Sequence, residues 1–270
     1  MRPGVDVVVP FRGDRTELEA TRARLELLRL GDGDTLEVVD NTATPGYGRN
    51  RGAERGSAEW LVFIDADVVP AADLLDRYFD PLPSPETAVI GGGVADEPVP
   101  HGAPIAARYA HIRGLMNQDN TFGWGEWAFA QTVNAAVRRE AFEAVGGFRE
   151  DIRAAEDADL CFRLKRAGWR LERREEAGVV HLSRGSVRDL ARQLMVHGAG
   201  GAWLDREYPG SVPPKRWPGL LWWCARAAAS GLVEAARTRD RDPAIVGLLG
   251  PVENVAYELG RRRRNEPPRP

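Results

Sequence analysis

A short apolar run followed directly by two carboxylates constrains this chain more than any other feature. Residues 61–64 (Leu-Val-Phe-Ile) are few for a helix and are typical of a strand buried on both faces. Asp65 and Asp67 follow at once, separated by Ala66. In open α/β sheets ligands bind beyond the carboxyl ends of the strands, and two acids one residue apart can reach one hard divalent cation that holds a diphosphate. The alternative is that both aspartates merely terminate a strand. The choice between a metal site and a plain strand end depends on the rest of the sequence.

Composition and charge limit the classes of partner. The chain has 270 residues, 43% of them hydrophobic and 29% charged, which is typical of a soluble globular protein. Its formal net charge of −3 provides no basic field for nucleic acid. Two cysteines, Cys161 and Cys224, make no disulfide framework, so we expect a reducing cytoplasm. We expect no signal peptide, and no run approaches the roughly 18 apolar residues of a membrane span.

The first 65 residues alternate between short strands and helical segments. The pattern predicts strands at 5–10, 36–39 and 61–64, with helices at 16–30 and 49–57. Thr16 and Glu19 have the spacing of a capping box for the first of these helices. Strands that alternate with helices predict a parallel, Rossmann-like half.

The second half of the chain contains a second acidic cluster. Glu156, Asp157 and Asp159 open a predicted helix, where acidic residues can also serve only the helix dipole. His181 follows two valines, and a single histidine in that position is more often structural than a metal ligand. A further helix is predicted at 187–197, followed by the glycine cluster 198–201.

Taken in order, six blocks of this sequence resemble a family-2 glycosyltransferase, over about residues 5–201. The blocks are VVVPFRGD, LEVVDN, GRNRGAERGSAEWLVFIDADVVP, NAAVRREAFEAVGGF, EDADLCFRLKRAGW and VVHLSRGS. The resemblance implies the α/β GT-A fold, which is Rossmann-like, with a mixed central sheet flanked by helices. It implies a catalytic domain over 1–205, with a donor half at about 1–95 and an acceptor half at about 96–205. A helical C-terminal extension over 206–260 and a basic, disordered tail over 261–270 would follow.

The same resemblance assigns a donor site to named residues. Asp67 is expected to bind Mn²⁺ or Mg²⁺ directly, Asp65 to contact the ribose or a metal-bound water, and His181 to be a third ligand. Asn41 stands where the family often has a second acid, which leaves the donor nucleotide open among UDP, GDP and dTDP. The donor-binding residues implied are Pro10, Phe11, Arg12, Asp40, Arg49, Asn50, Asp65, Ala66 and Asp67.

The acceptor side is assigned in the same way. Asp157 is implied as the base that removes the proton of the acceptor hydroxyl, with Asp159 as the fallback and Glu156 beside them. Trp124, Trp127 and Asn134 are the expected acceptor contacts, although a tryptophan beside glycines is as readily a core residue. The expected enzyme is an inverting transferase acting on a glycan, lipid-linked or natural-product hydroxyl.

Two other functions and three readings of the C-terminus stay open. A nucleotidyltransferase would need a basic, glycine-rich loop after the first strand, and a non-catalytic sugar-nucleotide-binding relative would not need Asp67 or Asp157. At the C-terminus, Trp217 and residues 220–223 with nearby arginines could form peripheral membrane contact through 212–264, at the inner face of the membrane. A helical lid or a contact between two copies are the alternatives.

Overall fold

The computed structural model describes residues 2–40, 43–100, 102–182 and 185–267. They form two compact units, each assembled from separate stretches of chain. The sheet unit consists of 1–95, 116–182 and 267–270, and the helical unit of 96–115 and 183–266. These units do not coincide with the division at residue 205 expected from the sequence.

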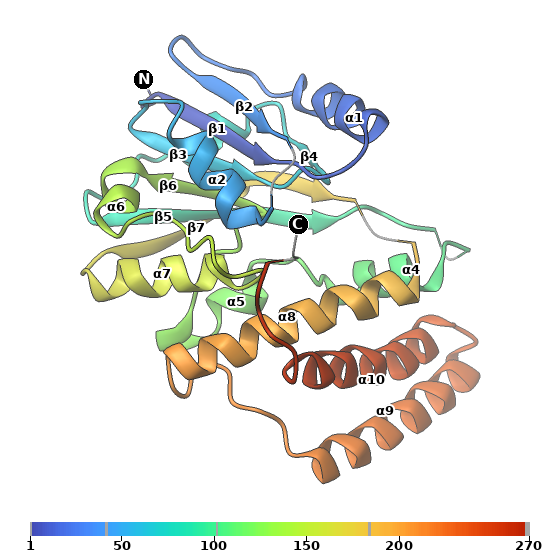
Figure 1. The fold of residues 1–270 in the computed structure, drawn as a ribbon. Helices are drawn as coiled ribbons and strands as arrows, with labels where there is room; N and C mark the ends of the chain where they lie inside the picture. The colour runs from blue at the N-terminus through green and yellow to red at the C-terminus, as the bar shows by residue number, and fades with distance from the viewer. Residues whose placement is uncertain (1, 41–42, 101, 183–184, 268–270) are drawn as a thin grey trace. The chain divides into compact units, whose positions relative to one another are not determined.

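The sheet unit is built on one mixed sheet with the strand order β2-β1-β3-β6-β5-β7-β4 (Figure 1). β1 pairs in parallel with β2 and β3, whereas the β3–β6, β5–β6 and β4–β7 pairs are antiparallel. The strands are β1 (Val5–Pro10), β2 (Thr35–Val39), β3 (Trp60–Ile64), β4 (Val68–Pro70), β5 (Thr87–Asp96), β6 (Asn134–Arg138) and β7 (Arg170–His181). The helices are α1 (Arg15–Leu25), α2 (Pro45–Ala53), α3 (Leu74–Tyr78), α5 (Asp119–Phe122), α6 (Arg139–Ala144) and α7 (Glu156–Arg166), with a 3-10 turn η1 (Gly125–Trp127).

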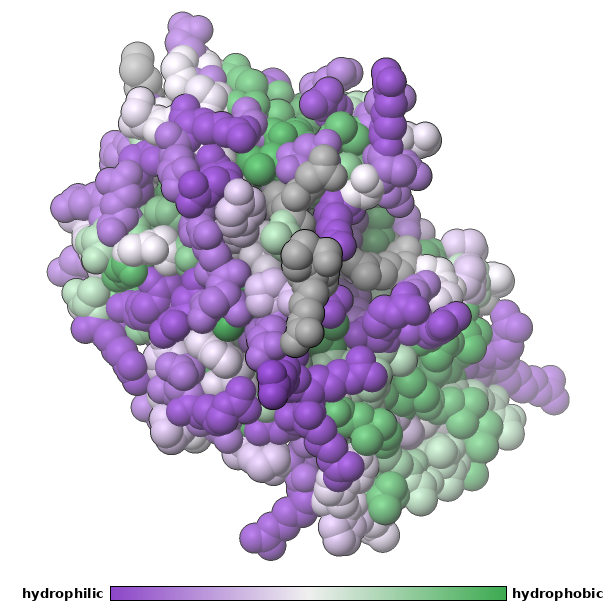
Figure 2. Space-filling model, in the orientation of Figure 1, coloured by the Kyte–Doolittle hydropathy of each residue, from purple (hydrophilic) through white to green (hydrophobic). Residues whose placement is uncertain are grey.

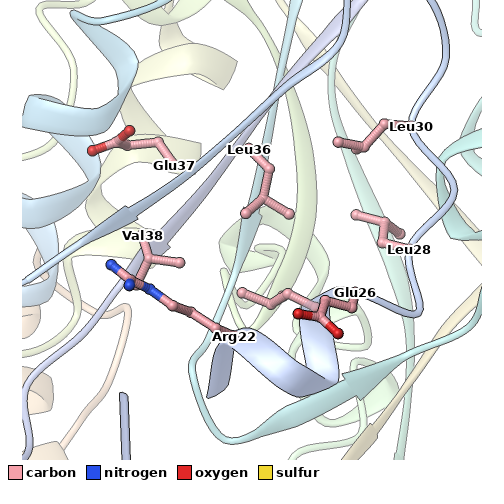
Figure 3. Close-up of a pocket in the computed structure, with 8 residues that line it drawn as sticks. Arg22, Glu26, Leu28, Leu30, Leu36, Glu37 and Val38 are labelled. Atoms are coloured by element: carbon pink, nitrogen blue, oxygen red, sulfur yellow. The ribbon is translucent and has the colours of Figure 1, made fainter. Parts of the chain in front are cut away.

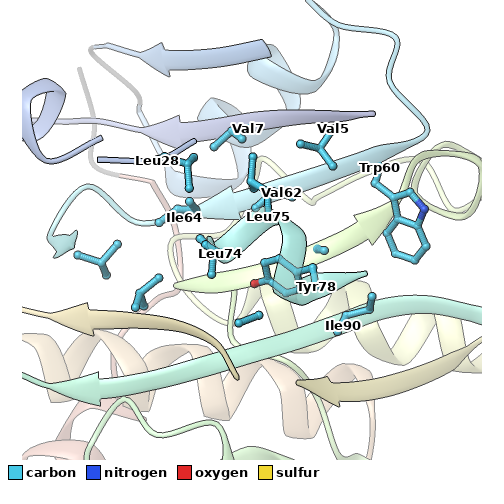
Figure 4. Close-up of a cluster of buried hydrophobic side chains, with 14 of the residues drawn as sticks. Val5, Val7, Leu28, Trp60, Val62, Ile64, Leu74, Leu75, Tyr78 and Ile90 are labelled. Atoms are coloured by element: carbon cyan, nitrogen blue, oxygen red, sulfur yellow. The ribbon is translucent and has the colours of Figure 1, made fainter. Parts of the chain in front are cut away.

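Alternating side chains of the central strands face a common hydrophobic core. Val5 and Val7 of β1 and Val62 and Ile64 of β3 lie in one cluster, in which Trp60 and Tyr78 are the largest members (Figure 4). Full burial of each such aliphatic side chain stabilises the fold by roughly 1.5–3 kcal/mol. Because β3 is buried on both faces, its carboxyl end delivers Asp65 to a fixed position.

The predicted strands are present, but the sequence pattern missed β4 and most of β7. β7 begins with Arg-Leu-Glu-Arg-Arg-Glu-Glu, so that charged side chains hide the two-residue period of a strand. Only its last apolar residues were visible in the sequence. β4 is three residues long, too short to show any period.

Several helix boundaries differ from the predictions. The helix predicted at 16–30 ends at Leu25, and the helix predicted at 49–57 spans Pro45–Ala53 instead. The capping box of α1 is made by Asp14 and Glu17, not by Thr16 and Glu19, because the Asp14 side chain accepts from the Glu17 backbone N–H and Glu17 returns a bond to Asp14. The predicted helix at 187–197 is longer, since α8 (Val187–Glu207) continues through the glycine cluster.

The glycines of α8 allow close helix packing in the helical unit. A Cβ on Gly198 would collide with the backbone carbonyl oxygen of Tyr257, and one on Gly260 would collide with the backbone of Met195. The glycines therefore bring α8 and α10 together instead of ending α8. The other helices of this unit are α4 (Ile105–Arg113), α9 (Trp217–Thr238) and α10 (Asp242–Gly260), and α10 contacts all three partners.

The end of α10 is held by Arg261, the first residue of the segment 261–270 that was predicted to be a disordered tail. Arg261 donates to the Val212 carbonyl oxygen at 2.9 Å. The rest of the predicted tail is described as far as residue 267, and residues 268–270 lie outside the described residues. Among the described residues, no helix has both the length and the apolar character needed to cross a membrane.

Candidate active site

A buried arginine joins the two acidic motifs that the sequence singled out. α2 begins at Pro45 with the Thr44 side chain accepting from the Tyr47 backbone N–H, and it carries Arg49 into the interior, where only 3% of the residue is exposed. The guanidinium nitrogens of Arg49 lie 2.6 Å from Asp65 Oδ1 and 2.7 Å from Glu156 Oε1. Although burial opposes its charge, the neighbouring carboxylates raise the pKa of Arg49. Arg49 therefore carries a permanent positive charge between the two acidic motifs, and Glu156 lies 107 positions from it in the sequence.

The ion pairs of Arg49 with Asp65 and Glu156 limit what Arg49 can do in a donor site. Each terminal nitrogen of the Arg49 guanidinium donates to a carboxylate, so the donor-binding role of Arg49 would be to hold acids in place and not to reach a phosphate. Burial raises the pKa of Asp65, and the charge of Asp67 adds to this, while Arg49 opposes it. Arg51, on the same helix, is 40% exposed and pairs with Glu54 and Glu150.

The loop after β3 is fixed by two residues of α1 that sequence reasoning missed. Thr21 Oγ1 and Arg24 Nη2 donate to the Ala66 carbonyl oxygen at 3.2 and 2.8 Å. The Asp65 backbone N–H donates to the Val133 carbonyl oxygen at 3.2 Å. The backbone between the two aspartates is thus held from both sides. Nothing in the sequence of α1 distinguishes Thr21 and Arg24 from surface residues.

The unpredicted β4–β7 pair brings His181 beside Asp67. Val68 lies opposite His181 in the antiparallel register, and the Leu182 backbone N–H donates to the Asp67 carbonyl oxygen at 2.8 Å. As a result His181 Nε2 lies 3.7 Å from Asp67 Oδ2. An imidazole and a carboxylate at this spacing can share one divalent cation.

Asp67 and His181 could supply two of the ligands of Mn²⁺ or Mg²⁺, and the rest of the coordination shell would come from other groups. Among the described residues no group of three or more His, Cys, Asp or Glu side chains is placed to hold a metal ion. A cation bound by one or two protein side chains, with substrate phosphate oxygens and water completing its shell, is the usual arrangement for Mg²⁺.

The surroundings of Asp157 raise the pKa of its carboxyl group. It lies in the first turn of α7, after Ala155, whose backbone adopts the left-handed region with φ 72°. Asp157 Oδ1 accepts from the Ala158 backbone N–H at 2.8 Å. Burial, together with the charge of neighbouring Glu156, raises the pKa of Asp157 to about 7. A carboxylate with that pKa can accept a proton near neutral pH.

The fallback base and one acceptor contact are not supported. Asp159 is completely buried and pairs with Arg163 at 2.8 Å, so no acceptor can reach it. Asn134 is also completely buried, and its amide donates to the carbonyl oxygens of Gly93 and Ala177 while its oxygen accepts from Tyr78. Both side chains are thus used within the fold, Asp159 in an ion pair with Arg163 and Asn134 in hydrogen bonds to strand backbone, as buried polar groups generally are.

Asn50 also has a structural role where donor binding was expected. Its side chain exchanges hydrogen bonds with the backbone of Phe148, donating to the carbonyl oxygen at 2.9 Å and accepting from the N–H at 2.9 Å. It also donates to Glu150 at 2.8 Å. Asn50 thus fixes the loop that precedes α7.

The two predicted acceptor tryptophans lie in one aromatic cluster on α7. Trp127 is half-buried with its ring centroid 5.2 Å from that of Phe162. Trp124 is 42% exposed and packs edge-on against Phe129 at 5.6 Å. Trp127 is therefore packed into the cluster, whereas Trp124 is partly open to solvent.

The strand ends at the predicted nucleotide side lie next to each other. The Phe11 backbone N–H donates to the Val39 carbonyl oxygen at 2.8 Å, which brings the residues after β1 and β2 together. Phe11 itself is buried, Pro10 is half-buried, and Arg12 and Asp40 are exposed. Asn41 lies outside the described residues.

A hollow of about 630 Å³ lies elsewhere on the sheet unit. It is open to solvent between α1 and β2, with Leu36 and Val38 on one side and Arg22 and Glu26 on the other (Figure 3). None of the predicted site residues lines it. The predicted site is therefore described by its charges and contacts and not by this hollow.

The fold and the acid cluster define the class of protein, an α/β transferase of the GT-A type. Residues 60–239 match the family described as glycosyl transferase family group 2, and the chain belongs to that family. It is similar to the succinoglycan biosynthesis protein ExoA of Rhizobium meliloti, 37% identical over 236 residues that cover 77% of this chain and 70% of that protein.

Two further likenesses agree with this family. The pre-mycofactocin glycosyltransferase of Mycobacterium tuberculosis is 25% identical over 253 residues, 84% of this chain. The chain spans about half the length of that relative, 53%. In fold, it is similar to the mannosyltransferase PcManGT from Pyrobaculum calidifontis, solved with GDP-Man and Mn²⁺, with a TM-score of 0.58, 17% identity, and coverage of 94% of this chain and 88% of that one.

Proposed function

We propose that this protein is a metal-dependent, inverting glycosyltransferase that moves a sugar from a nucleotide-diphosphate sugar to a hydroxyl acceptor. The observation that carries the proposal is the Arg49 bridge. It holds Asp65, from the motif after β3, and Glu156, the neighbour of Asp157, in one ionic cluster. Donor-side and acceptor-side carboxylates are thereby fixed against each other within the sheet unit.

The donor diphosphate would lie at Asp65, Asp67 and His181. Asp67 and His181 are the residues that would hold the cation, since Asp67 Oδ2 and His181 Nε2 lie 3.7 Å apart and a carboxylate and an imidazole can both bind Mn²⁺. When bound, Mn²⁺ or Mg²⁺ supplies Lewis-acid stabilisation for the negative charge that builds on the leaving diphosphate. Asp65, which is held by Arg49, would orient the ribose or a bound water.

Asp157 would take the proton of the acceptor hydroxyl. A carboxylate whose pKa is raised to about 7 is a stronger base than an ordinary aspartate and still unprotonated in a good fraction of molecules at neutral pH. Attack by the hydroxyl opposite the departing diphosphate inverts the anomeric configuration without a covalent sugar–enzyme intermediate. Glu156 then serves as the positioning residue, because it ties the first turn of α7 to Arg49.

The exposed ring of Trp124 supports a sugar-like acceptor. A sugar ring packs its C–H face against an aromatic ring, and Trp124 is exposed within the aromatic cluster of α7. The acceptor class stays open between a glycan, a lipid-linked sugar and a natural product. The location proposed is the cytoplasm, which the free thiols of Cys161 and Cys224 support.

The two alternative functions make different predictions for nucleotide binding. A non-catalytic relative would bind a nucleotide sugar without turning it over, whereas a nucleotidyltransferase would use a nucleoside triphosphate. Against the latter, the loop after β1 is Phe11-Arg12-Gly13-Asp14, which has a single glycine and an acid that caps α1.

Calorimetric titration with UDP, GDP and dTDP, each with and without Mn²⁺, tests the donor site directly. We expect one nucleotide to bind tightly and only with metal. GDP is the first to try, because the mannosyltransferase of similar fold was solved with GDP-Man and Mn²⁺. His181→Ala should weaken the metal-dependent binding at least about tenfold, whereas His111→Ala, a half-buried histidine of the helical unit, should leave it unchanged. No binding of any nucleotide in the presence of Mn²⁺ would contradict the proposal.

A further inference from the structure

The outward side of α9 is apolar over most of its length. Leu221, Trp222, Leu232 and Val233 are 58%, 64%, 51% and 67% exposed. At helical spacing, the positions 218, 222, 225, 229, 233 and 236 follow one another along one side of the helix, and all six residues are apolar. Figure 2 shows hydrophobic surface gathered over the C-terminal helices. The 22 residues of α9 make this apolar stripe about 33 Å long.

The opposite side of α9 is already used for packing within the helical unit. Gly231 of α9 faces Gly247 of α10, and a Cβ on Gly231 would lie 2.5 Å from the Pro243 carbonyl oxygen. Leu220, on the same side, is buried. α9 is therefore apolar on both sides, although only one side is covered by α10. A helix with apolar residues on both sides is normally buried on both sides, so we expect a partner to cover the outward stripe of α9.

Basic side chains accompany this stripe. The Arg226 guanidinium lies 5.4 Å from the centre of the exposed Trp222 ring, and Arg262 lies 5.3 Å from that of Trp217. Residues 212–266 contain ten basic and six acidic side chains, whereas the whole chain has a net charge of −3. Positive charge is thus concentrated in the segment that also exposes tryptophan and leucine.

We infer that the outward face of α9 is a docking surface for an anionic lipid bilayer, with Leu221, Trp222, Leu232 and Val233 inserted among the acyl chains and Arg226 at the headgroups. Exposed tryptophan beside arginine, on a helix that lies flat, is the composition of an interfacial helix. Each basic residue near an anionic surface adds attraction that falls off within a Debye length.

The charges disfavour the other occupant, a second copy of the chain. A two-fold contact between α9 faces would bring equivalent surfaces together, and each would bring its own Arg226. Like charges in such a contact repel, while anionic headgroups attract the same arginines. A helix lying in the interface also agrees with the position of Arg226 near the middle of α9, where a spanning helix would have to bury it.

Flotation of the purified full chain with lipid vesicles tests the inference. The vesicles consist of phosphatidylcholine alone, or of phosphatidylcholine and phosphatidylglycerol in equal parts. We expect the chain to float with the mixed vesicles and to lose binding at high salt. The double variant Leu221→Ser/Trp222→Ser should reduce the bound fraction at least about tenfold.

Matched variants test whether vesicle binding is specific to the outward face of α9 or comes from any exposed apolar or basic side chain. Leu82→Ser removes an apolar side chain of the sheet unit that is 64% exposed, and it should float as the wild type does. Arg226→Gln should weaken binding several-fold, whereas Arg170→Gln, an exposed arginine of β7, should not. Circular dichroism and thermal unfolding confirm that each variant is folded.

Several outcomes would overturn the inference. One is a wild-type chain that does not float, and another is a Leu221→Ser/Trp222→Ser variant that floats as well as the wild type. Equal binding to both vesicle compositions would remove the role of charge. A dimer in light scattering that the double variant dissociates, with no flotation, would assign α9 to a contact between copies. None of these measurements needs a donor or an acceptor, so their result is independent of the proposed transfer activity.

Discussion

Arg49 and Asp65 form an ion pair with 2.6 Å between Nη2 and Oδ1, in which the arginine is 3% exposed and the aspartate side chain 32%. The second guanidinium nitrogen of Arg49 is taken by Glu156. Arg49 is thus enclosed by carboxylates from two separate sequence motifs. Its charge compensates two acids that would otherwise repel each other in a poorly hydrated place.

Removing Arg49 should cost much more stability than removing Arg51. Arg49→Gln leaves Glu156 and Asp65 without their common partner, and we expect the free energy of unfolding to fall by about 3 kcal/mol. Arg51→Gln removes a 40% exposed arginine from the same helix, and we expect a change within about 1 kcal/mol. Urea unfolding at neutral pH measures both. Equal effects of the two substitutions would show that the Arg49 cluster is not a stabilising centre.

Asp157→Asn should abolish turnover and leave nucleotide binding nearly intact. The amide has the same shape but cannot accept the hydroxyl proton, so kcat should fall at least about a hundredfold. Asp151→Asn, at an aspartate whose side chain is 72% exposed, is the matched control and should keep full activity. Product assays and calorimetry on the same preparations separate the two effects. Retention of more than a few per cent of the wild-type rate in Asp157→Asn would exclude this residue as the base.

The activity should fall on the acid side of neutral pH. Asp157 has to be unprotonated in order to act as a base, and its pKa is raised to about 7 by burial and by Glu156. Below the inflection, kcat/KM should drop about tenfold per pH unit. A cation bound nearby lowers the pKa, so the inflection should lie at or below pH 7 and well above the usual range of aspartate. An ordinary aspartate inflection near pH 4 would contradict the assigned environment.

The same raised pKa predicts that Asp157 lowers stability at neutral pH. Between its unfolded and folded pKa values the folded protein holds the proton that the unfolded chain has lost, so the stability contributed by this group falls as the pH rises from about 4 to about 7. Metal-free Asp157→Asn should therefore be more stable than the wild type at about pH 8, by at least about 1 kcal/mol. The difference should shrink as the pH approaches 4. Thermal unfolding in the presence of a chelator, across this pH range, checks the sign.

The sequence was informative wherever one strong local signal coincided with one element. The apolar run of β3 predicted a strand that ends just before Asp65, and the acidic start of α7 predicted a helix that begins with Glu156. The partners of Asp159 and Asn134 could not be predicted, because residue type alone does not reveal a partner. Arg163 lies one helical turn from Asp159, and the carbonyl groups bound by Asn134 belong to strands distant in sequence.

Other parts of the site depend on contacts that no local pattern encodes. The β4–β7 pair, which places His181 beside Asp67, involves one strand of three residues and one whose first half is charged. Thr21 and Arg24 hold the Ala66 carbonyl oxygen from α1, a helix that the sequence predicts without assigning a role to either residue. Such contacts arise from the tertiary fold and become visible only in the structure.

The glycine cluster of α8 follows the predicted end of a helix in the sequence, but in the structure it lies within α8 and packs against α10. Gly198→Ala would place a methyl group against the Tyr257 carbonyl oxygen, a backbone atom that cannot move aside without shifting α10. We expect a loss of about 1–3 kcal/mol in the free energy of unfolding. Gly219→Ala, in the first turn of α9 with no atom within 4 Å of its new Cβ, should be neutral or slightly stabilising, because alanine favours the helix by about 0.5–1 kcal/mol. If Gly198→Ala were as harmless as Gly219→Ala, the close α8–α10 contact would be absent in solution, and the glycine cluster would have to act as the helix end that its sequence suggests.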